Sequence, residues 1–222
     1  MPDWPDPPLP PIHHRQYDVK AYRQGDDAIL IRGSVRDDKP GDTYVAGDPD
    51  PLTMHFMVVD LTVAFPSLEI TGAEVVFETY PQPDCPRITD HYHRLIGLSV
   101  ARGFTHNVRE LFGGPRGCAH VTALLQAMAP VAVQCRLSVG GGDTLQAPVA
   151  FRTAASVAEQ RRAMVAGMIN TCHAWAEGGA LVATAERGEQ SVLPLPISAR
   201  LVSLGVDPDT WQEEFRARRQ QP

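Results

Sequence analysis

The sequence lacks the long apolar runs of membrane-spanning proteins and the concentrated basic charge of nucleic-acid-binding proteins. No apolar stretch approaches the ~18–20 residues needed to cross a bilayer. The chain has 20 Lys and Arg against 26 Asp and Glu, a net charge of −6 with histidine neutral. A nucleic-acid-binding surface needs clustered Lys and Arg to displace counterions. We therefore expect neither a membrane nor a nucleic acid as a partner.

Several catalytic and export signatures are also missing. The sequence contains no dinucleotide-binding fingerprint, no nucleophile elbow and no paired-carboxylate motif. Residues 1–12 are rich in Pro and Asp, whereas a secretory signal is basic and then apolar. We therefore expect a cytoplasmic protein whose four cysteines are reduced thiols.

The chain is long and apolar enough to form a core without disulfide support. It has 222 residues, of which 43% are hydrophobic, and a domain of this size buries roughly 70% of its unfolded surface. The predicted elements are a hairpin over 15–36, strands over 54–64 and 68–79, and helices over about 117–130 and 156–176. Strands followed by helices predict an α+β fold. Its mostly antiparallel sheet comes from the N-terminal half, packed by two main helices from the C-terminal half.

The distribution of proline and apolar residues suggests three segments. Residues 1–12 contain prolines that exclude a helix or central strand, which predicts an extended arm. Residues 13–185 are predicted as a single α+β domain. Residues 186–222 are predicted as an apolar C-terminal extension that ends in a short helix.

Four stretches of the chain resemble one bacterial family. HHRQYDVKAYRQGDDAILIRGSVRDDKP contains an opening His-x-Arg strand and a later Asp-x-Lys-like element, and LTVAFPSLEITGAEVVFETYP is a strand pair. GGPRGCAHV contains a Gly-Cys-x-His turn that enters a helix, and INTCHAWAEGG is a late Cys-His helix end. Over roughly residues 12–182 these features resemble the family called domain of unknown function 2889. The resemblance implies a fold and a compartment, but no activity.

Cys118 and His120 form the most sharply marked candidate site. Gly117 permits a tight entry into the predicted helix. Cys118 would follow in the first turn, where backbone donors, the helix dipole and Arg116 favour a thiolate. His120 in the same turn would be close enough to share a proton or a ligand. The pattern suits a nucleophile with its base, or half of a metal site. We therefore predict Cys118, His120 and Arg116 as catalytic residues.

A metal site would need two further cysteines. Cys85 and Cys172 could complete a Cys₃His set with Cys118 and His120, of the kind that holds zinc. However, the long spacings match no zinc-finger pattern, and Cys172 lies on the apolar stripe of its predicted helix. We therefore expect no stoichiometric metal and assign no cofactor, zinc being the compatible candidate. Cys135 and Cys172 are predicted as core thiols, and Cys118 as the most reactive of the four.

Other polar residues are interpreted as structural. His55 and Asp60 point to opposite faces of their predicted strand, so they do not form a pair. Asp37, Asp38 and Lys39 are interpreted as a solvated turn.

Two hypotheses for function follow. The first is a small-molecule enzyme or ligand-binding protein with a site around Cys118 and His120. The second is a non-catalytic binding, carrier or accessory module. It would engage a partner subunit or a second copy of the chain through the arm 1–12 and the tail 186–222. A pocket lined by Cys118 and His120 would favour the first hypothesis, and their burial in apolar packing would favour the second.

Overall fold

The computed structural model describes residues 5–139, 156–166, 168–187 and 193–219. The chain divides into two compact units, Met1–Val139 and Gly140–Pro222, and each unit is described separately. The boundary between them falls inside the range 13–185. The division into arm, single domain and extension therefore stays a prediction.

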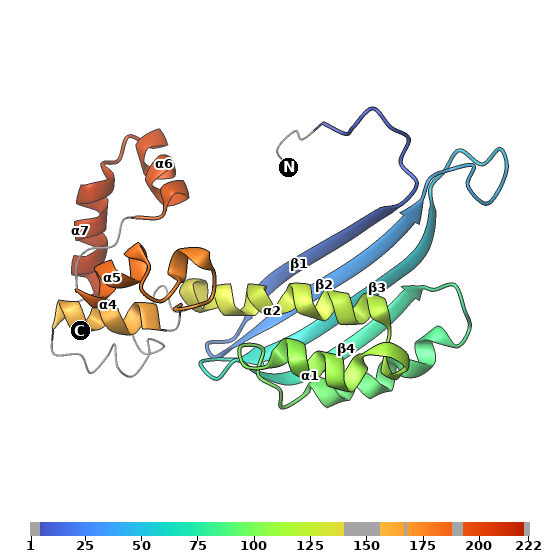
Figure 1. The fold of residues 1–222 in the computed structure, drawn as a ribbon, viewed down its shortest axis with the longest axis horizontal. Helices are drawn as coiled ribbons and strands as arrows, with labels where there is room; N and C mark the ends of the chain where they lie inside the picture. The colour runs from blue at the N-terminus through green and yellow to red at the C-terminus, as the bar shows by residue number, and fades with distance from the viewer. Residues whose placement is uncertain (1–4, 140–155, 167, 188–192, 220–222) are drawn as a thin grey trace. The chain divides into compact units, whose positions relative to one another are not determined.

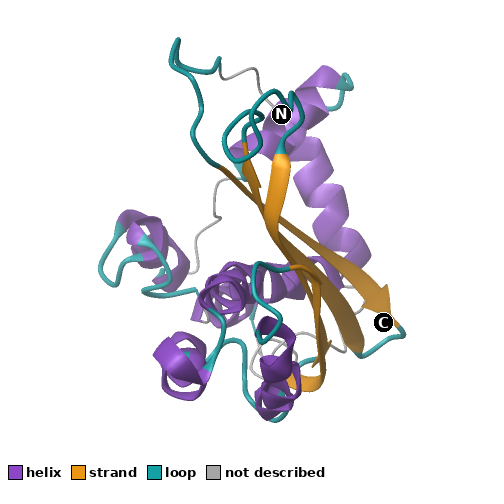
Figure 2. Cartoon of the chain, turned by 90° about the vertical axis from the view of Figure 1, so that its right-hand side faces the viewer, coloured by secondary structure: helices purple, strands orange, loops and turns teal. Residues whose placement is uncertain are grey.

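The first unit is built on a four-stranded antiparallel sheet with the strand order β1-β2-β3-β4 (Figure 1). The strands are β1 (His14–Gln24), β2 (Ala28–Lys39), β3 (Leu52–Ala64) and β4 (Glu69–Thr79). Gly25 adopts a φ of 70° in the turn between β1 and β2, a conformation that favours glycine. The sheet has the twist expected of antiparallel strands (Figure 2). The predicted hairpin, the two further strands and the α+β class are confirmed.

Helical segments follow the sheet and cover one of its faces. They are η1 (Cys85–Leu95), α1 (Phe104–Phe112), η2 (Gly114–Arg116) and α2 (Ala119–Val139). Helix α2 contacts β1, β2 and β3, while α1 contacts α2 and η1 contacts β4. The helix predicted over about 117–130 is confirmed, but it continues past Pro130. Proline removes one backbone donor, yet Pro130 is exposed and Ala132 beyond it is buried, so packing continues along the same helix.

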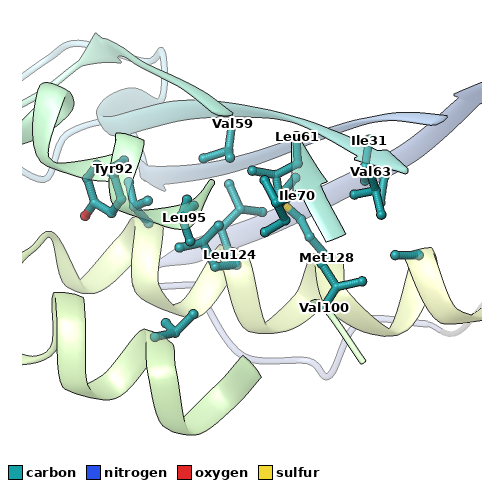
Figure 3. Packing of buried hydrophobic residues seen from close by; sticks show 14 of the residues in the cluster. Ile31, Val59, Leu61, Val63, Ile70, Tyr92, Leu95, Val100, Leu124 and Met128 are labelled. Atoms are coloured by element: carbon teal, nitrogen blue, oxygen red, sulfur yellow. The ribbon is translucent and has the colours of Figure 1, made fainter. Parts of the chain in front are cut away.

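The core lies between α2 and the inner face of the sheet (Figure 3). Alternate residues of β2 and β3 point toward α2 because side chains alternate along a strand. Gly33 lies on this face in close contact with α2, since a Cβ there would meet Met128 Sδ at 2.6 Å. The inward-facing residues exposed by 1% or less are Ile29, Ile31, Val35, Met57, Val59, Leu61 and Val63, and their partners on α2 are Leu124, Leu125 and Met128.

The second unit is helical in its described residues. It contains α4 (Val157–Ala166), η4 (His173–Trp175), α5 (Ala180–Glu186), α6 (Leu195–Ser203) and α7 (Pro208–Arg219). The last of these is the predicted C-terminal helix. Asp207 caps it, accepting the backbone N–H of Thr210 on Oδ2 at 2.9 Å.

The helix predicted over 156–176 ends earlier, at Ala166. A turn follows in which Asn170 has a φ of 62°, and its backbone N–H donates to the carbonyl of Trp175 at 2.8 Å. Asparagine tolerates this left-handed conformation, which a continuing helix excludes. Apolar spacing therefore indicated a longer helix than the backbone forms. In the described parts of both units, no helix is long and apolar enough to span a membrane.

Candidate functional site

A row of three polar side chains crosses the inner face of the sheet at one end. In the strand register, Arg15 on β1 lies opposite Asp37 on β2, which lies opposite His55 on β3. Asp37 continues the inward alternation of Ile31 and Val35 and is 1% exposed. In the part of the chain that the structure describes, it is the one charged residue that is buried.

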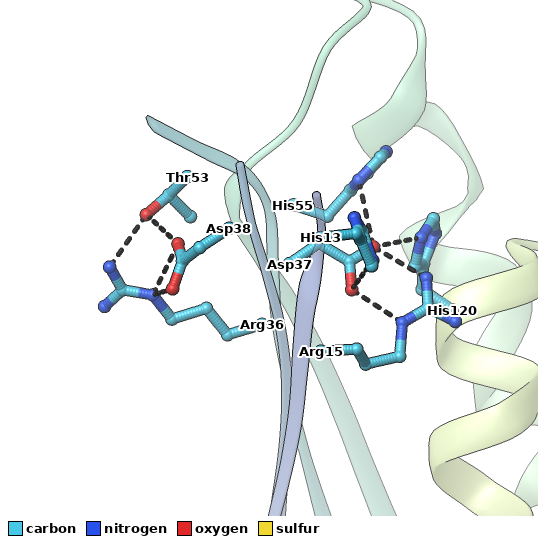
Figure 4. Close-up of polar contacts among 8 residues, drawn as sticks. All are labelled: His13, Arg15, Arg36, Asp37, Asp38, Thr53, His55 and His120. Atoms are coloured by element: carbon cyan, nitrogen blue, oxygen red, sulfur yellow. Dashed lines mark hydrogen bonds and ion pairs between the residues drawn. The ribbon is translucent and has the colours of Figure 1, made fainter. Parts of the chain in front are cut away.

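The interpretation of residues 37–39 as a solvated turn is therefore wrong. All three belong to β2, and an irregularity in the β2–β3 register separates Asp37 from Asp38. Asp38 is also paired, since it accepts hydrogen bonds from Arg36 and from the hydroxyl of Thr53 (Figure 4). Regular strand alternation places Asp37 in the core, which composition alone did not indicate.

The carboxylate of Asp37 is the centre of the cluster (Figure 4). Arg15 donates two hydrogen bonds to it, Nε to Oδ1 and Nη2 to Oδ2, both at 2.6 Å. His120 Nε2 lies 2.9 Å from Oδ2. His55 Nδ1 is 3.4 Å from Oδ2, and His13 Nε2 is 3.5 Å from Oδ1. The hydrogen bonds from Arg15 outweigh burial and lower the pKa of Asp37 to about 2, so the carboxylate is ionised at neutral pH.

His120 connects this carboxylate to Cys118. Its Nδ1 lies 3.7 Å from Cys118 Sγ, while its Nε2 faces Asp37. Burial lowers the pKa of His120, so the ring is neutral at pH 7 and carries one proton. An ionised carboxylate can only accept hydrogen bonds, so that proton belongs on Nε2. The lone pair of Nδ1 then points at Cys118 Sγ.

Cys118 caps helix α2 instead of lying within its first turn. Its carbonyl accepts the N–H of Thr122 at 2.9 Å, and its own N–H donates to the hydroxyl of Tyr92 at 2.8 Å. Tyr92 is buried, which raises its pKa to about 12 and keeps the hydroxyl protonated. Arg116 lies in η2 and donates from Nη2 to the carbonyl of Arg109 at 3.2 Å. Cys118 is thus held at its backbone, with its thiol beside His120.

His55 completes the cluster from the third strand. Its ring stacks on that of His120, with centroids 4.0 Å apart and an interplanar angle of 26°. Its Nδ1 is buried and has no hydrogen-bond partner. The nearby oxygen, Asp37 Oδ2, already accepts from Arg15 and His120. Burial, and then the proximity of His120, lower the pKa of His55, so this imidazole is also neutral at pH 7.

The cysteines predicted from the sequence occupy different environments. Cys85 begins η1 and, like Cys135, is partly buried against the core. Burial raises the pKa of the Cys135 thiol, in agreement with its predicted core position. Cys172 lies in the second unit and is exposed, so its prediction as a core thiol is wrong. Of the predicted zinc ligands, Cys118 and His120 are in contact.

A different set of ligand atoms converges in the structure. Among the described residues, Asp37, His55 and His120 form one group whose ligand atoms all lie within 4.8 Å of one another. Sequence reasoning did not select Arg15, Asp37 or His55. Two features of the sequence could have indicated these residues. One is the inward alternation of β2 and β3, and the other is the register of the predicted hairpin, which sets Arg15 opposite Asp37.

Removal of the Tyr92 hydroxyl tests how Cys118 is anchored. We expect Tyr92→Phe to lower the free energy of unfolding by about 1–2 kcal/mol, because the N–H of Cys118 loses its acceptor in a partly buried place. Urea denaturation measures the difference. Tyr22→Phe, at a side chain that is 49% exposed, is the control and should change stability little. Equal stabilities of Tyr92→Phe and the wild-type protein would contradict the anchoring role.

Comparison with known proteins identifies the family to which the chain belongs. Apart from His55, the residues of the cluster belong to three elements of the resemblance: His13-x-Arg15, the Asp-x-Lys-like element at Asp37, and Cys118-x-His120. No curated protein and no solved structure gave a significant match. The model of a protein family of unknown function, DUF2889, matches residues 13–134, more than half of the chain and every residue of the cluster. The chain therefore belongs to the DUF2889 family.

Proposed function

We propose that this protein is a cysteine-dependent enzyme that acts on a small electrophilic molecule. Cys118 is the nucleophile, His120 its base, and Asp37 the residue that orients the base. One observation carries the proposal: the imidazole of His120 bridges the thiol and the buried carboxylate, 3.7 Å from Sγ and 2.9 Å from Oδ2. A nucleophile, a base and an orienting carboxylate in this order are the parts that thiol catalysis needs.

The position of the proton supports this assignment of roles. Asp37 accepts the Nε2 proton of His120, which leaves the Nδ1 lone pair free to take the proton of the Cys118 thiol. Arg15 holds the carboxylate through two hydrogen bonds, so the orientation of His120 is built into the sheet. An orienting group of this kind fixes the tautomer of the base.

The start of helix α2 stabilises the negative charge that develops in the proposed reaction. The first N–H groups of a helix have no acceptor within the helix and favour negative charge near them. Cys118 lies at this end of α2, immediately before Ala119. The same donors suit a thiolate on Cys118 and the oxyanion of a carbonyl substrate.

The reaction that fits is acyl transfer from an ester or thioester. The thiol proton moves to His120 Nδ1 as Cys118 Sγ bonds to the carbonyl carbon. His120 returns the proton to the leaving alkoxide or thiolate as the C–O or C–S bond breaks. Water, deprotonated by His120, then attacks the S-acyl enzyme, and the acid product leaves with Cys118 regenerated as a thiol.

Alkylation of the native protein tests the proposal. Chelator-treated protein is labelled with iodoacetamide from about pH 5 to 9, and peptide mass spectrometry gives a rate for each cysteine. We expect Cys118 to be labelled below pH 7 and at least about tenfold faster there than Cys172, which is exposed and begins a helical turn of three residues. His120→Ala should remove most of this advantage.

One control variant and one further test variant distinguish loss of the base from a general disturbance of the start of α2. His93→Ala removes an exposed histidine whose ring nitrogen bonds the carbonyl of Asp90, and it should leave labelling unchanged. Arg116→Ala tests the sequence-based prediction that this charge favours the thiolate. If Cys118 is labelled only after denaturation, the proposal fails, and the non-catalytic module becomes the better hypothesis.

A further inference from the structure

We infer that Asp37, His55 and His120 form a binding site for one divalent transition-metal ion of the Zn²⁺ or Co²⁺ class. The three ligand atoms come from β2, β3 and α2 and lie within 4.8 Å of one another. Figure 4 shows both imidazoles directed at the carboxylate of Asp37. This set differs from the cysteine-based set that the sequence suggested.

The separations of the ligand atoms fit a single ion. Oδ2 of Asp37 is 2.9 Å from His120 Nε2 and 3.4 Å from His55 Nδ1. With metal–ligand bonds of about 2.1 Å, neighbouring ligands lie about 3.0 Å apart in octahedral and about 3.4 Å apart in tetrahedral coordination. The carboxylate oxygen therefore stands at a coordination distance from each imidazole nitrogen, and all three ligand atoms lie within 4.8 Å of one another.

His55 gives a second, independent observation. Its Nδ1 is buried, has no hydrogen-bond partner and faces a carboxylate oxygen that already accepts two hydrogen bonds. Buried polar atoms without a partner are rare in folded proteins and call for an explanation. A cation between His55 Nδ1 and Asp37 Oδ2 would be bound by both atoms and would give each of them a partner.

The donor set selects the class of ion. Two imidazole nitrogens and one carboxylate oxygen suit Zn²⁺, Co²⁺ and Ni²⁺, whereas Mg²⁺ and Ca²⁺ prefer all-oxygen sites. The ion pair with Arg15 balances the negative charge of Asp37, so the two imidazole nitrogens contribute most to the choice of metal ion. The same two hydrogen bonds from Arg15 hold the carboxylate in position, as outer partners commonly do for metal ligands.

Metal binding at this site excludes the catalytic role of His120, a consequence that rests on the proposed function. An ion bound to Nε2 takes the lone pair there, so the single proton of the neutral ring moves to Nδ1. Nδ1 then has no lone pair to accept the proton of Cys118. Because Cys118 lies on the Nδ1 side of the ring, its sulfur is not a ligand of the ion.

Titration of the chelator-treated 222-residue chain with Co²⁺ tests the inference. We expect one Co²⁺ per chain, visible d–d absorption, no sulfur-to-cobalt charge-transfer band, and displacement by Zn²⁺. His55→Ala should weaken Co²⁺ binding at least about tenfold, whereas His93→Ala should not. His55→Gln is a second variant in case the alanine protein folds poorly, and circular dichroism checks the folding of each variant.

The outcomes distinguish the metal site from the proposed function. Absence of stoichiometric Co²⁺ binding, binding that His55→Ala leaves unchanged, or a strong sulfur-to-cobalt band would each overturn the site. Saturating Zn²⁺ should slow Cys118 labelling. An unchanged rate would contradict the inference that a bound ion prevents His120 from acting as the base. A Cys118 that fails to react in the metal-free protein, alongside His55-dependent Co²⁺ binding, would refute the proposed function and support the metal site.

Discussion

Asp37→Asn should slow the alkylation of Cys118 by a factor on the order of a hundred at pH 6.5 in chelator. The reason is the tautomer of His120. The carboxylate only accepts hydrogen bonds and therefore keeps the imidazole proton on Nε2. An amide can also donate, so it permits the tautomer that carries its proton on Nδ1, where it faces the Cys118 sulfur and blocks proton transfer.

The chain contains a matched control for this substitution. Asp60 on β3 accepts two hydrogen bonds from Arg32, at 2.8 and 2.6 Å, in the same bidentate arrangement that joins Asp37 to Arg15. Asp60 lies on the opposite face of the sheet, away from His120. Asp60→Asn should therefore leave the labelling rate of Cys118 near that of the wild-type protein. If Asp37→Asn is labelled as fast as Asp60→Asn, the carboxylate does not orient the base.

Stability at acid pH should also depend on Asp37. Its pKa falls from 3.8 to about 2 in the folded protein, chiefly through the hydrogen bonds from Arg15. A lowered carboxyl pKa stabilises the fold above the unfolded value, and this contribution disappears as the pH falls through the folded value. The pH-dependent part amounts to about 2 kcal/mol at pH 7, of which roughly half is lost by pH 3.

Urea denaturation of metal-free protein at several pH values between 7 and 3 measures this contribution. The stability difference between the wild-type protein and Asp37→Asn should shrink as the pH falls below about 4. The lowered pKa values of His55 and His120 reduce stability at a higher pH than Asp37 does. The unfolded chain binds protons on these histidines more readily than the folded protein as the pH falls through about 6.5. A stability difference that stays constant down to pH 3 would contradict the assignment to Asp37.

The sequence by itself determined the fold class because the relevant signals are local. Alternating apolar residues in β2 and β3, and helical spacing in Val121, Leu124, Leu125 and Met128, predict which face of each element is buried. The hairpin turn and the start of α2 at Gly117 and Cys118 are also marked by neighbouring residues. The Cys118–His120 contact was predictable for the same reason, since both residues lie at one helix start.

The extents of two helices were not determined by local signals. Apolar spacing predicted a helix to about residue 130, but α2 continues past Pro130 because packing beyond the proline is retained. Apolar spacing suggested a helix to residue 176, but α4 ends at Ala166 and the backbone turns at Asn170. The packing of Ala132 beyond Pro130 and the left-handed backbone at Asn170 decide these extents, and one-dimensional spacing records neither.

The site was decided by tertiary structure. Asp37 resembles a turn residue next to Asp38, Lys39 and Pro40, and only pairing with β1 and β3 turns it inward between Arg15 and His55. His120 reaches this carboxylate because α2 crosses the sheet above it, a contact between residues 83 positions apart in the chain. Local propensity specifies where the chain is strand or helix, but proximity across that separation arises only when the elements pack.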